Sequence, residues 1–467
     1  MSRKGISRRR FLQRGVGSTA GLGLGLGLGG FPPILRRAMA GPTSTRKKLL
    51  FIFLRGGIDG VDTVIPYGDQ GIPGQGIKTY LEARPTIGIP SGQAHGLTSD
   101  FAKLHPSLQS PSGEFGPQVQ RIFHGNLDER GAQLALLHRI GYEAQNRSHF
   151  SSEQFWENAV PGEVKLEKGV FNNYVTSYPD DAELRALTVH NDQMVIMKGE
   201  TLIPVLSSVE AYSLPSNVTL GAAPSPGAPL GSGLAGAYGQ PFDASRPTSR
   251  LTYETGRSLV ETLQFFEANV LSQEYLPEAE ANPYYDAMSD RVFARSVRDC
   301  ARLLKQIDTL QITGCNQDGY DTHGSQALRL SGRLEDLGLA LTALFYDLKP
   351  IWENTLVMTL SEFGRTSEEN GNLGTDHGES SLMVMMGGSV NGGVYNCDPT
   401  TWDHGDLFST PTGRYVAHRT DYRAVYGEIF QKHLGDPEGR MDSIVPGYSE
   451  LAAANSNGFF TPLGFLA

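Results

Sequence analysis

Short segments made almost entirely of apolar residues alternate along this chain with longer segments whose apolar residues recur every three or four positions. The short segments cover residues 47–53, 132–140, 184–190, 310–314, 355–360 and 381–386. Continuous apolar runs of this length are typical of strands that are buried on both faces, as in parallel sheets. The pattern therefore predicts an α/β fold, a three-layer sandwich with a mostly parallel central sheet between helices.

The amphipathic segments predict the helices that cover this sheet. The clearest spans 326–348 and ends just before Pro350, with an apolar face formed by Leu330, Leu334, Leu337, Leu341 and Leu344. Weaker patterns predict helices at 148–158, about 252–275 and 285–308. Residues near 200–250 are rich in Pro, Gly, Ser and Ala and offer few side chains to a core, so this segment reads as a surface insertion.

Residues 1–40 have the features of an export signal. Arg8 and Arg9 form a twin-arginine pair, a weakly apolar glycine-rich stretch follows at 21–30, and Ala38-Met39-Ala40 supplies a small-x-small cleavage site. The sequence therefore predicts transport by the twin-arginine translocase and a mature chain that begins near Gly41. We expect a periplasmic or extracellular protein with a single domain over residues 41–467.

Composition excludes several classes of protein. The chain has 467 residues and a formal charge of −10, and loss of the basic signal makes the rest more acidic, which argues against a nucleic-acid partner. Outside the signal, no stretch reaches the ~18 apolar residues of a stable membrane span. Cys300, Cys315 and Cys397 form no C-x-x-C pair, so an iron–sulfur or structural zinc site is not expected.

Polar side chains that bind metals or anions follow several of the predicted strands. Because sites in parallel sheets form at the carboxyl ends of the strands, these residues are expected near a common edge. The candidates are Asp59, Arg147, Ser148, His149, Asp321, His323, Glu362, Arg365, Asp376 and His377.

The chemistry of this set is that of a metal-dependent displacement. Carboxylates and imidazoles bind transition metals, and two metals about 3.5–4 Å apart stabilise displacement at phosphorus or sulfur. A serine beside a metal becomes a nucleophile, and an arginine can hold two oxygens of an anion. The set predicts one or two divalent ions (zinc, manganese or calcium) and a small anionic ester as substrate.

Each residue alone also fits a simpler role. Asp59 lies between glycines and fits a turn, Ser148 fits a helix N-cap, and Arg365 fits an ordinary surface position. Asp321 and His323 fit a hydrogen-bonded pair at the start of the long helix. The prediction of a site depends on their convergence.

Several stretches together resemble a known family. They are LLFIFLRGGIDGVDTVIPYGD, RSHF, DTHGSQ, TLVMTLSEFGRT, TDHGESSLMVMMGG and TDYRAVYGEIF, and they cover most of residues 48–430. With the twin-arginine signal, they resemble an exported bacterial group called domain of unknown function 1501. That group is similar to the alkaline phosphatase and sulfatase superfamily, which implies an alkaline phosphatase-like α/β sandwich that usually holds two divalent metals.

The resemblance implies roles for individual residues. Ser148 matches the nucleophile, and His149 and Arg365 join it in the candidate catalytic set. One implied metal cluster is Asp321, His323 and His377, and the other is Asp59, Glu362 and Ser148, with Asp376 as a further ligand. Two departures are the single residue between Asp321 and His323 and the presence of Phe363, where phosphatases have His and sulfatases Asn.

The implied function is an exported metal-dependent hydrolase of phosphate or sulfate esters, with Arg365 or Arg147 holding the anion. The residues at Ser148 do not form the C/S-x-P-x-R motif of formylglycine sulfatases, which disfavours that branch. A catalytically altered binding or scaffold protein on the same fold is the alternative. An exported redox enzyme is a third reading, disfavoured by the cysteine pattern and by the lack of a dinucleotide-binding loop.

Overall fold

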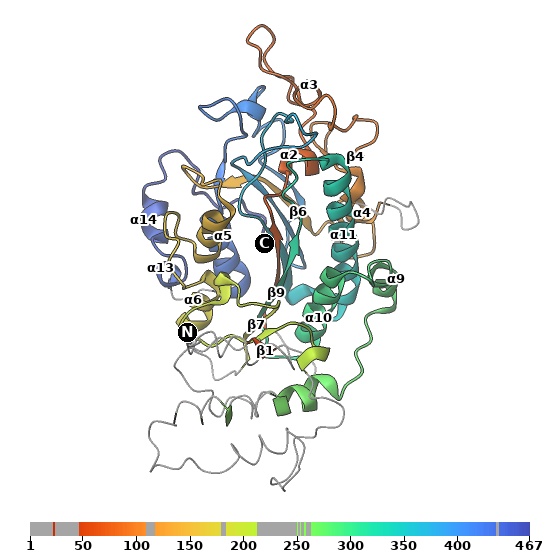
Figure 1. Ribbon diagram of the computed structural model, residues 1–467, viewed down its shortest axis with the longest axis vertical. Coiled ribbons are helices and arrows are strands. Elements are labelled where there is room, and N and C mark those ends of the chain that lie inside the picture. Colours follow the sequence, from red (N-terminus) through yellow and green to blue (C-terminus); the bar gives the residue numbers. More distant parts are fainter. Residues whose placement is uncertain are drawn as a thin grey trace, which may run out of the picture.

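The computed structural model of this protein describes residues 22–23, 46–108, 117–178, 184–212, 250, 253, 256–257, 263–435 and 439–467. Most of the expected export signal and most of the expected insertion near 200–250 lie outside the described residues. Figure 1 shows the described chain as a central sheet with helices on both sides.

In the described part of the chain, ten strands form the central sheet, in the order β1-β8-β7-β9-β2-β10-β11-β6-β12, with β13 also paired to β6. Their bounds are β1 Leu22–Gly23, β2 Lys48–Arg55, β6 Leu134–Gly141, β7 Ala186–Val189, β8 Val205–Leu206, β9 Ile312–Asp318, β10 Thr355–Leu360, β11 Ser381–Gly387, β12 Gly393–Tyr395 and β13 Thr420–Asp421. Strands β8, β7, β9, β2 and β10 run parallel, whereas β11 is antiparallel to both of its neighbours. The predicted α/β class with a mostly parallel sheet is confirmed, and each of the six predicted strands is present.

The two buried faces of strand β2 explain why the sequence is continuously apolar at this segment. Leu50, Ile52 and Leu54 pack into the core on one face of the sheet. Leu49, Phe51 and Phe53 pack into the core on the other face. A strand buried on both faces has no polar side to alternate with.

The helices divide between these two cores. One core contains side chains of α4 Gln118–Phe123, α9 Asn282–Asp286, α10 Val292–Gln306 and α11 Gln326–Asp347. The opposite core contains side chains of α5 His149–Asn158, α6 Val170–Ser177, α12 Tyr422–Glu428 and α13 Met441–Ile444, and α14 Tyr448–Ala453 packs against it. The long predicted helix is α11, and its predicted apolar face is buried.

One edge of the sheet carries the loops that contain the candidate site residues. The carboxyl ends of β7, β9, β2, β10 and β6 lie at this edge, and the reversed strand β11 begins there. The short helices α2 Gly60–Thr63 and α3 Tyr80–Ala83 and a small sheet of β3 Val64–Ile65, β4 His95–Gly96 and β5 Lys103–Leu104 lie beyond it, in the upper part of Figure 1.

None of the helices in the described part of the chain combines the length and the apolar character that crossing a membrane would require.

Buried histidines should make the fold sensitive to mild acid. Burial lowers the pKa values of His105, His138 and His433 to about 4, whereas an unfolded histidine titrates near 6.5. The unfolded chain therefore binds more protons between these values, so the free energy of unfolding falls as pH falls through this window. We expect urea titrations to show a loss of about 1–2 kcal/mol per histidine between pH 7 and pH 5.

The variant His433→Gln tests the cause, because glutamine keeps a donor for the carbonyl of Lys48, which lies 2.9 Å from His433 Nε2. Its stability should fall less between pH 7 and pH 5 than that of the wild type. Chelator in every sample removes any effect of bound metal. Equal losses in the two proteins would contradict the assignment.

Candidate functional site

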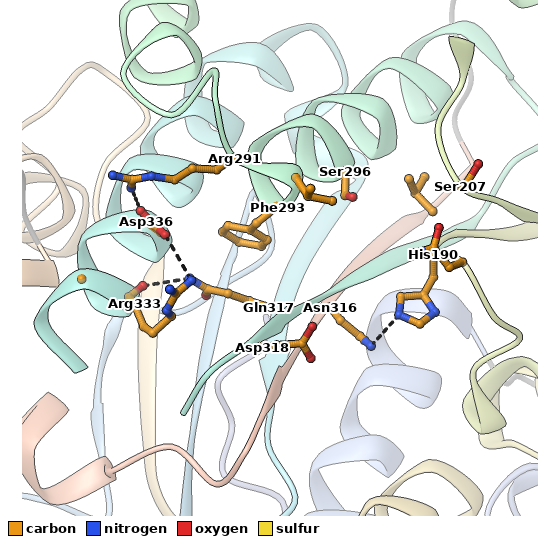
Figure 2. A pocket seen from close by; sticks show the side chains of 14 residues that line it. His190, Ser207, Arg291, Phe293, Ser296, Asn316, Gln317, Asp318, Arg333 and Asp336 are labelled. Carbon is orange, nitrogen blue, oxygen red and sulfur yellow. Dashed lines mark hydrogen bonds and ion pairs between the residues drawn. The ribbon is translucent and has the colours of Figure 1, made fainter. Parts of the chain in front are cut away.

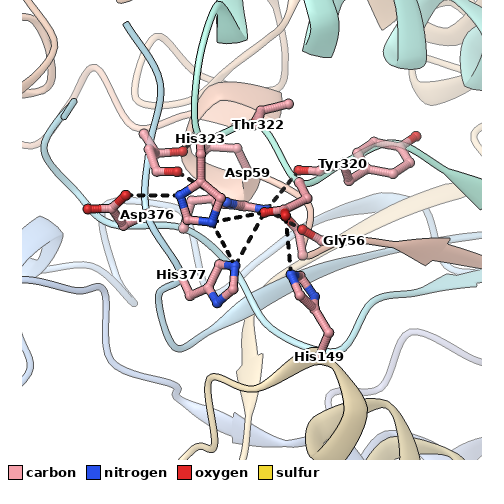
Figure 3. Close-up of polar contacts among 12 residues, drawn as sticks. Gly56, Asp59, His149, Tyr320, Thr322, His323, Asp376 and His377 are labelled. Atoms are coloured by element: carbon pink, nitrogen blue, oxygen red, sulfur yellow. Dashed lines mark hydrogen bonds and ion pairs between the residues drawn. The ribbon is translucent and has the colours of Figure 1, made fainter. Parts of the chain in front are cut away.

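Histidine and aspartate side chains from three loops meet at the carboxyl edge of the sheet (Figure 3). His149 is the first residue of α5 and follows β6, Asp321 and His323 follow β9, and His377 precedes β11. The structure brings together the three residues of the first cluster expected from the sequence and adds His149 to them.

The four side chains gather around the Asp321 carboxylate. The Nε2 atoms of His323 and His377 are 2.9 Å apart, and Asp321 Oδ1 lies 3.1 Å from the first and 3.2 Å from the second. Asp321 Oδ2 is 3.5 Å from His149 Nε2. We call His149, Asp321, His323 and His377 the histidine cluster.

The other nitrogen of each ring is anchored to an acceptor. His377 Nδ1 is 2.8 Å from the carbonyl oxygen of Arg147, His323 Nδ1 is 3.0 Å from Asp376 Oδ1, and His149 Nδ1 is 2.7 Å from Glu362 Oε1. A carbonyl or an ionised carboxylate only accepts, so each Nδ1 carries the proton, and in a neutral ring Nε2 then carries a lone pair. His149 Nε2 is buried and has no hydrogen-bond partner in the described structure.

These assignments make the centre of the histidine cluster a meeting point of acceptors. When the rings are neutral, the Nε2 lone pairs of His323 and His377 face Asp321 Oδ1, and the Nε2 lone pair of His149 faces Asp321 Oδ2, with no proton between them. Such an arrangement is electrostatically unfavourable by itself and becomes favourable when a cation occupies its centre.

Local charges and burial shift the pKa values of the same groups. Burial opposes ionisation of Asp321, but the hydrogen bond and charge of Arg365 prevail and lower the pKa of Asp321 to about 2. A hydrogen bond from Asn370 lowers the pKa of Asp376, and burial lowers the pKa of His377. The hydrogen bond with Glu362 raises the pKa of His149, so this ring takes up a second proton, at Nε2, more readily than a free imidazole does.

Glu362 and Phe363 orient the cluster. The Glu362 side chain is fully buried, and its Oε1 accepts from the Gly56 N–H at 2.8 Å as well as from His149. The ring of Phe363 packs against the rings of His149 and His377, with centroids 4.9 and 4.7 Å apart. Phe363 therefore supplies an apolar support for two imidazoles.

Arg365 lies beneath the cluster with a completely buried side chain. Its guanidinium donates to Asp321 Oδ1 at 2.7 Å and to the carbonyl oxygens of Gly56, Gly57, Tyr320 and Thr375. Because these donors are used inside the protein, the geometry favours a positioning role for Arg365 over the anion contact expected from the sequence.

The loop after β2 approaches the cluster so closely that it requires glycine. Gly56 has a φ of +116°, and a Cβ atom there would collide with the backbone nitrogen of Asp321. The glycine thus lets β2 and the β9 loop share Arg365.

Asp59 belongs to a different network. It caps α2, and its Oδ2 accepts from Arg84 Nη1 at 2.8 Å and from Gln326 Nε2 at 2.7 Å, all in full burial. Among the described residues, the group of His, Cys, Asp or Glu ligand atoms that lie within 4.8 Å of one another is His149, Asp321 and His377. The structure does not assemble the second expected cluster around Asp59, because the charge of Arg84 already neutralises this carboxylate.

Ser148 and Arg147 lie at the surface next to His149. Ser148 is the N-cap residue of α5, but its side chain makes no capping hydrogen bond. The guanidinium of Arg147 is 43% exposed, lies 3.2 Å from Glu379 and packs 4.9 Å above the ring of Tyr415. Unlike Arg365, Arg147 can reach solvent.

Sequence reasoning placed His149 at the correct edge but gave it no ligand position. The sequence feature that could have identified His149 as a ligand is its place directly after a predicted strand. The same feature identified Ser148 as a candidate. Glu362 was expected to bind a metal directly, and the structure instead directs it at His149 Nδ1. Asp376 likewise faces His323 Nδ1.

Together these features describe a mixed α/β protein with a group of ligand-type side chains at the carboxyl edge of a mostly parallel sheet. Residues 235–405 match the family described as Protein of unknown function (DUF1501). The match supports the family resemblance over a segment that contains Asp321, His323, Glu362, Asp376 and His377. Searches among curated proteins and among solved structures found no match.

Replacement of Arg365 should test its positioning role. In Arg365→Lys one ammonium replaces a planar group that serves four carbonyls and a carboxylate, so we expect the free energy of unfolding to fall by about 2–4 kcal/mol in urea titrations. The matched control is Arg147→Lys at the surface, which should change stability by less than about 0.5 kcal/mol. Wild-type stability of Arg365→Lys would refute this role.

Proposed function

We propose that this protein is a metal-dependent hydrolase of phosphate or sulfate esters that holds one divalent ion in the histidine cluster. The observation that carries the proposal is that three imidazole Nε2 atoms gather around the Asp321 carboxylate, with ligand atoms of His149, Asp321 and His377 within 4.8 Å of one another. A cation is the partner that such a set of acceptors accommodates.

The surroundings of the cluster support the same conclusion. Histidines that bind metals commonly donate their second ring nitrogen to a carboxylate or a carbonyl, which fixes the ring and its tautomer. Glu362, Asp376 and the Arg147 carbonyl stand in this position for the three rings. Three nitrogen donors and one carboxylate suit zinc or manganese, whereas calcium prefers six to eight oxygens.

We propose one ion and not two. The residues expected to hold a second ion either orient a histidine, as Glu362 does, or are neutralised by an arginine, as Asp59 is. Phe363 cannot bind a metal at all.

The chain's own residues supply the remaining chemistry of the proposed reaction. A divalent ion in the cluster would lower the pKa of a bound water and withdraw charge from an ester oxygen. Ser148, exposed and next to His149 in the chain, is the proposed nucleophile. Arg147 offers an exposed guanidinium for the anion, and Arg365 holds Asp321 in place.

The resemblance to the alkaline phosphatase and sulfatase superfamily, which is more specific than the mixed α/β fold, is part of this proposal. It is supported by ligand-type residues at the carboxyl ends of a mostly parallel sheet. Export by the twin-arginine route is also part of it and rests on the residue pattern of the first 40 positions. That route carries folded proteins, so the ion could be inserted before export.

Metal analysis tests the cluster directly. We expect purified protein, loaded with zinc or manganese and dialysed, to retain about one equivalent by mass spectrometry of the elements. His377→Ala should lose it, and Glu362→Gln should lower the affinity about 10–100-fold because the carboxylate that polarises His149 is gone. Glu153→Gln, one helical turn beyond His149, is the matched control. Folded wild-type protein without any metal would end the proposal.

Turnover of aryl phosphates and aryl sulfates tests the reaction. We expect hydrolysis of one class, lost on chelation and restored by zinc or manganese, and Arg147→Ala should lower kcat/KM at least about tenfold. Ser148→Ala should lower kcat about 100-fold or more if the serine attacks and leave it nearly unchanged if water attacks. A metal-loaded protein inert toward both classes would contradict hydrolysis.

A binding or scaffold protein on the same fold is the second candidate. The engagement of Asp59 by Arg84 and the presence of Phe363 favour it, because both remove a ligand from the expected two-metal site. This candidate predicts metal binding without turnover and full function of Ser148→Ala in a complementation assay.

A further inference from the structure

A cavity of about 500 Å³ lies at the same edge of the sheet as the histidine cluster (Figure 2). It opens where β7, β8 and β9 end and where side chains of α10 and α11 approach them. Its volume falls within the ~300–1,000 Å³ range of small-molecule sites. Neither the sequence motifs nor the proposed function accounts for it.

The charges that line the cavity cancel. Arg291 and Arg333 both pair with Asp336 on one side. Asp318, an exposed residue at the end of β9, forms no ion pair within the described part of the chain. The lining thus contains two guanidinium groups and two carboxylates, and it offers no excess positive charge to an anion.

The polar groups of the cavity offer both donors and acceptors. Asn316 Nδ2 lies 3.2 Å from His190 Nε2, while Asn316 Oδ1 is buried without a hydrogen-bond partner in the described structure. Ser207 and Ser296 add hydroxyl groups, which donate and accept. The exposed carboxylate of Asp318 adds an acceptor that a ligand hydroxyl can reach.

An aromatic side chain completes the lining. Figure 2 shows Phe293 between the arginine side of the cavity and the side that carries His190 and Ser207. A ring in this position can pack against the C–H groups of a ligand whose hydroxyls reach the polar groups on either side. A purely apolar ligand would instead cover the exposed carboxylate of Asp318 without a partner.

We infer that this cavity binds a neutral, polyhydroxylated molecule of the saccharide class. The balanced charge disfavours anions and cations, the Asp318 carboxylate and the serine hydroxyls favour a ligand rich in hydroxyl groups, and Phe293 supplies an apolar face. Asp318 is the binding residue that accepts from the ligand.

The cavity and the histidine cluster are separate sites. The cavity lies beside the end of β9, and the cluster includes residues of the loop that follows this strand. Asp318 and Asp321 are three residues apart, so their Cα atoms lie at most about 11 Å from each other. Saccharide binding nevertheless involves no residue of the histidine cluster, and the inference holds whether or not the proposed hydrolase activity exists.

Ligand-observed NMR on the metal-free full chain tests the inference. The probes are glucose, galactose, mannose, xylose, maltose and cellobiose at up to about 50 mM, with inorganic phosphate as the anionic comparison. We expect saturation transfer to at least one saccharide and no protein-dependent broadening of the ³¹P resonance of inorganic phosphate. Asp318→Ala should weaken saccharide binding at least tenfold, with metal content unchanged.

The control is Ser331→Ala on the outer side of α11, which should bind the saccharide as the wild type does. Asp318 is exposed, so its variant is expected to fold. No binding of any saccharide to folded wild type, equal binding by Asp318→Ala, or binding of phosphate lost in Asp318→Ala would each overturn the inference.

Discussion

The guanidinium of Arg365 joins the loops that follow neighbouring strands, and the arrangement of the ligand-type side chains depends on it. Its contacts reach the loop after β2 through Gly56 and Gly57 and the loop after β9 through Tyr320 and Asp321. A buried cation must be paired, and here one carboxylate and several carbonyls share that task. Because the same carboxylate oxygen faces His323 and His377, the charge that holds the loops together also orients the cluster.

Two arginine–carboxylate pairs at this edge have opposite consequences. Arg84 encloses Asp59 completely, with both side chains at 0% exposure, so this aspartate stabilises α2 and faces no ligand. Arg365 is equally buried, but its partner Asp321 is 45% exposed and turns a second oxygen toward His149. The difference in exposure, and not the residue type, decides which aspartate can serve in a site.

Strand β9 organises both sites of the protein. Its last residues, Asn316 and Asp318, line the saccharide-type cavity, and the loop beyond it carries Asp321 and His323. The two sites differ in electrostatics. The histidine cluster gathers acceptors that suit a cation, whereas the cavity balances its charges and suits a neutral ligand. A central parallel strand can support both because its neighbours on either side extend the same edge.

The sequence by itself determined the sheet, the long helix α11 and the edge at which the candidate residues lie. Continuous apolar runs follow from burial of a strand on both faces, and three-to-four periodicity follows from burial of one face of a helix. It could not determine which candidates meet. Arg84 neutralises Asp59 across 25 positions, and Glu362 reaches His149 across 213 positions. Only the tertiary structure decided these pairings, because the role of a charged side chain depends on the partner that packing brings to it, and no local pattern encodes that partner.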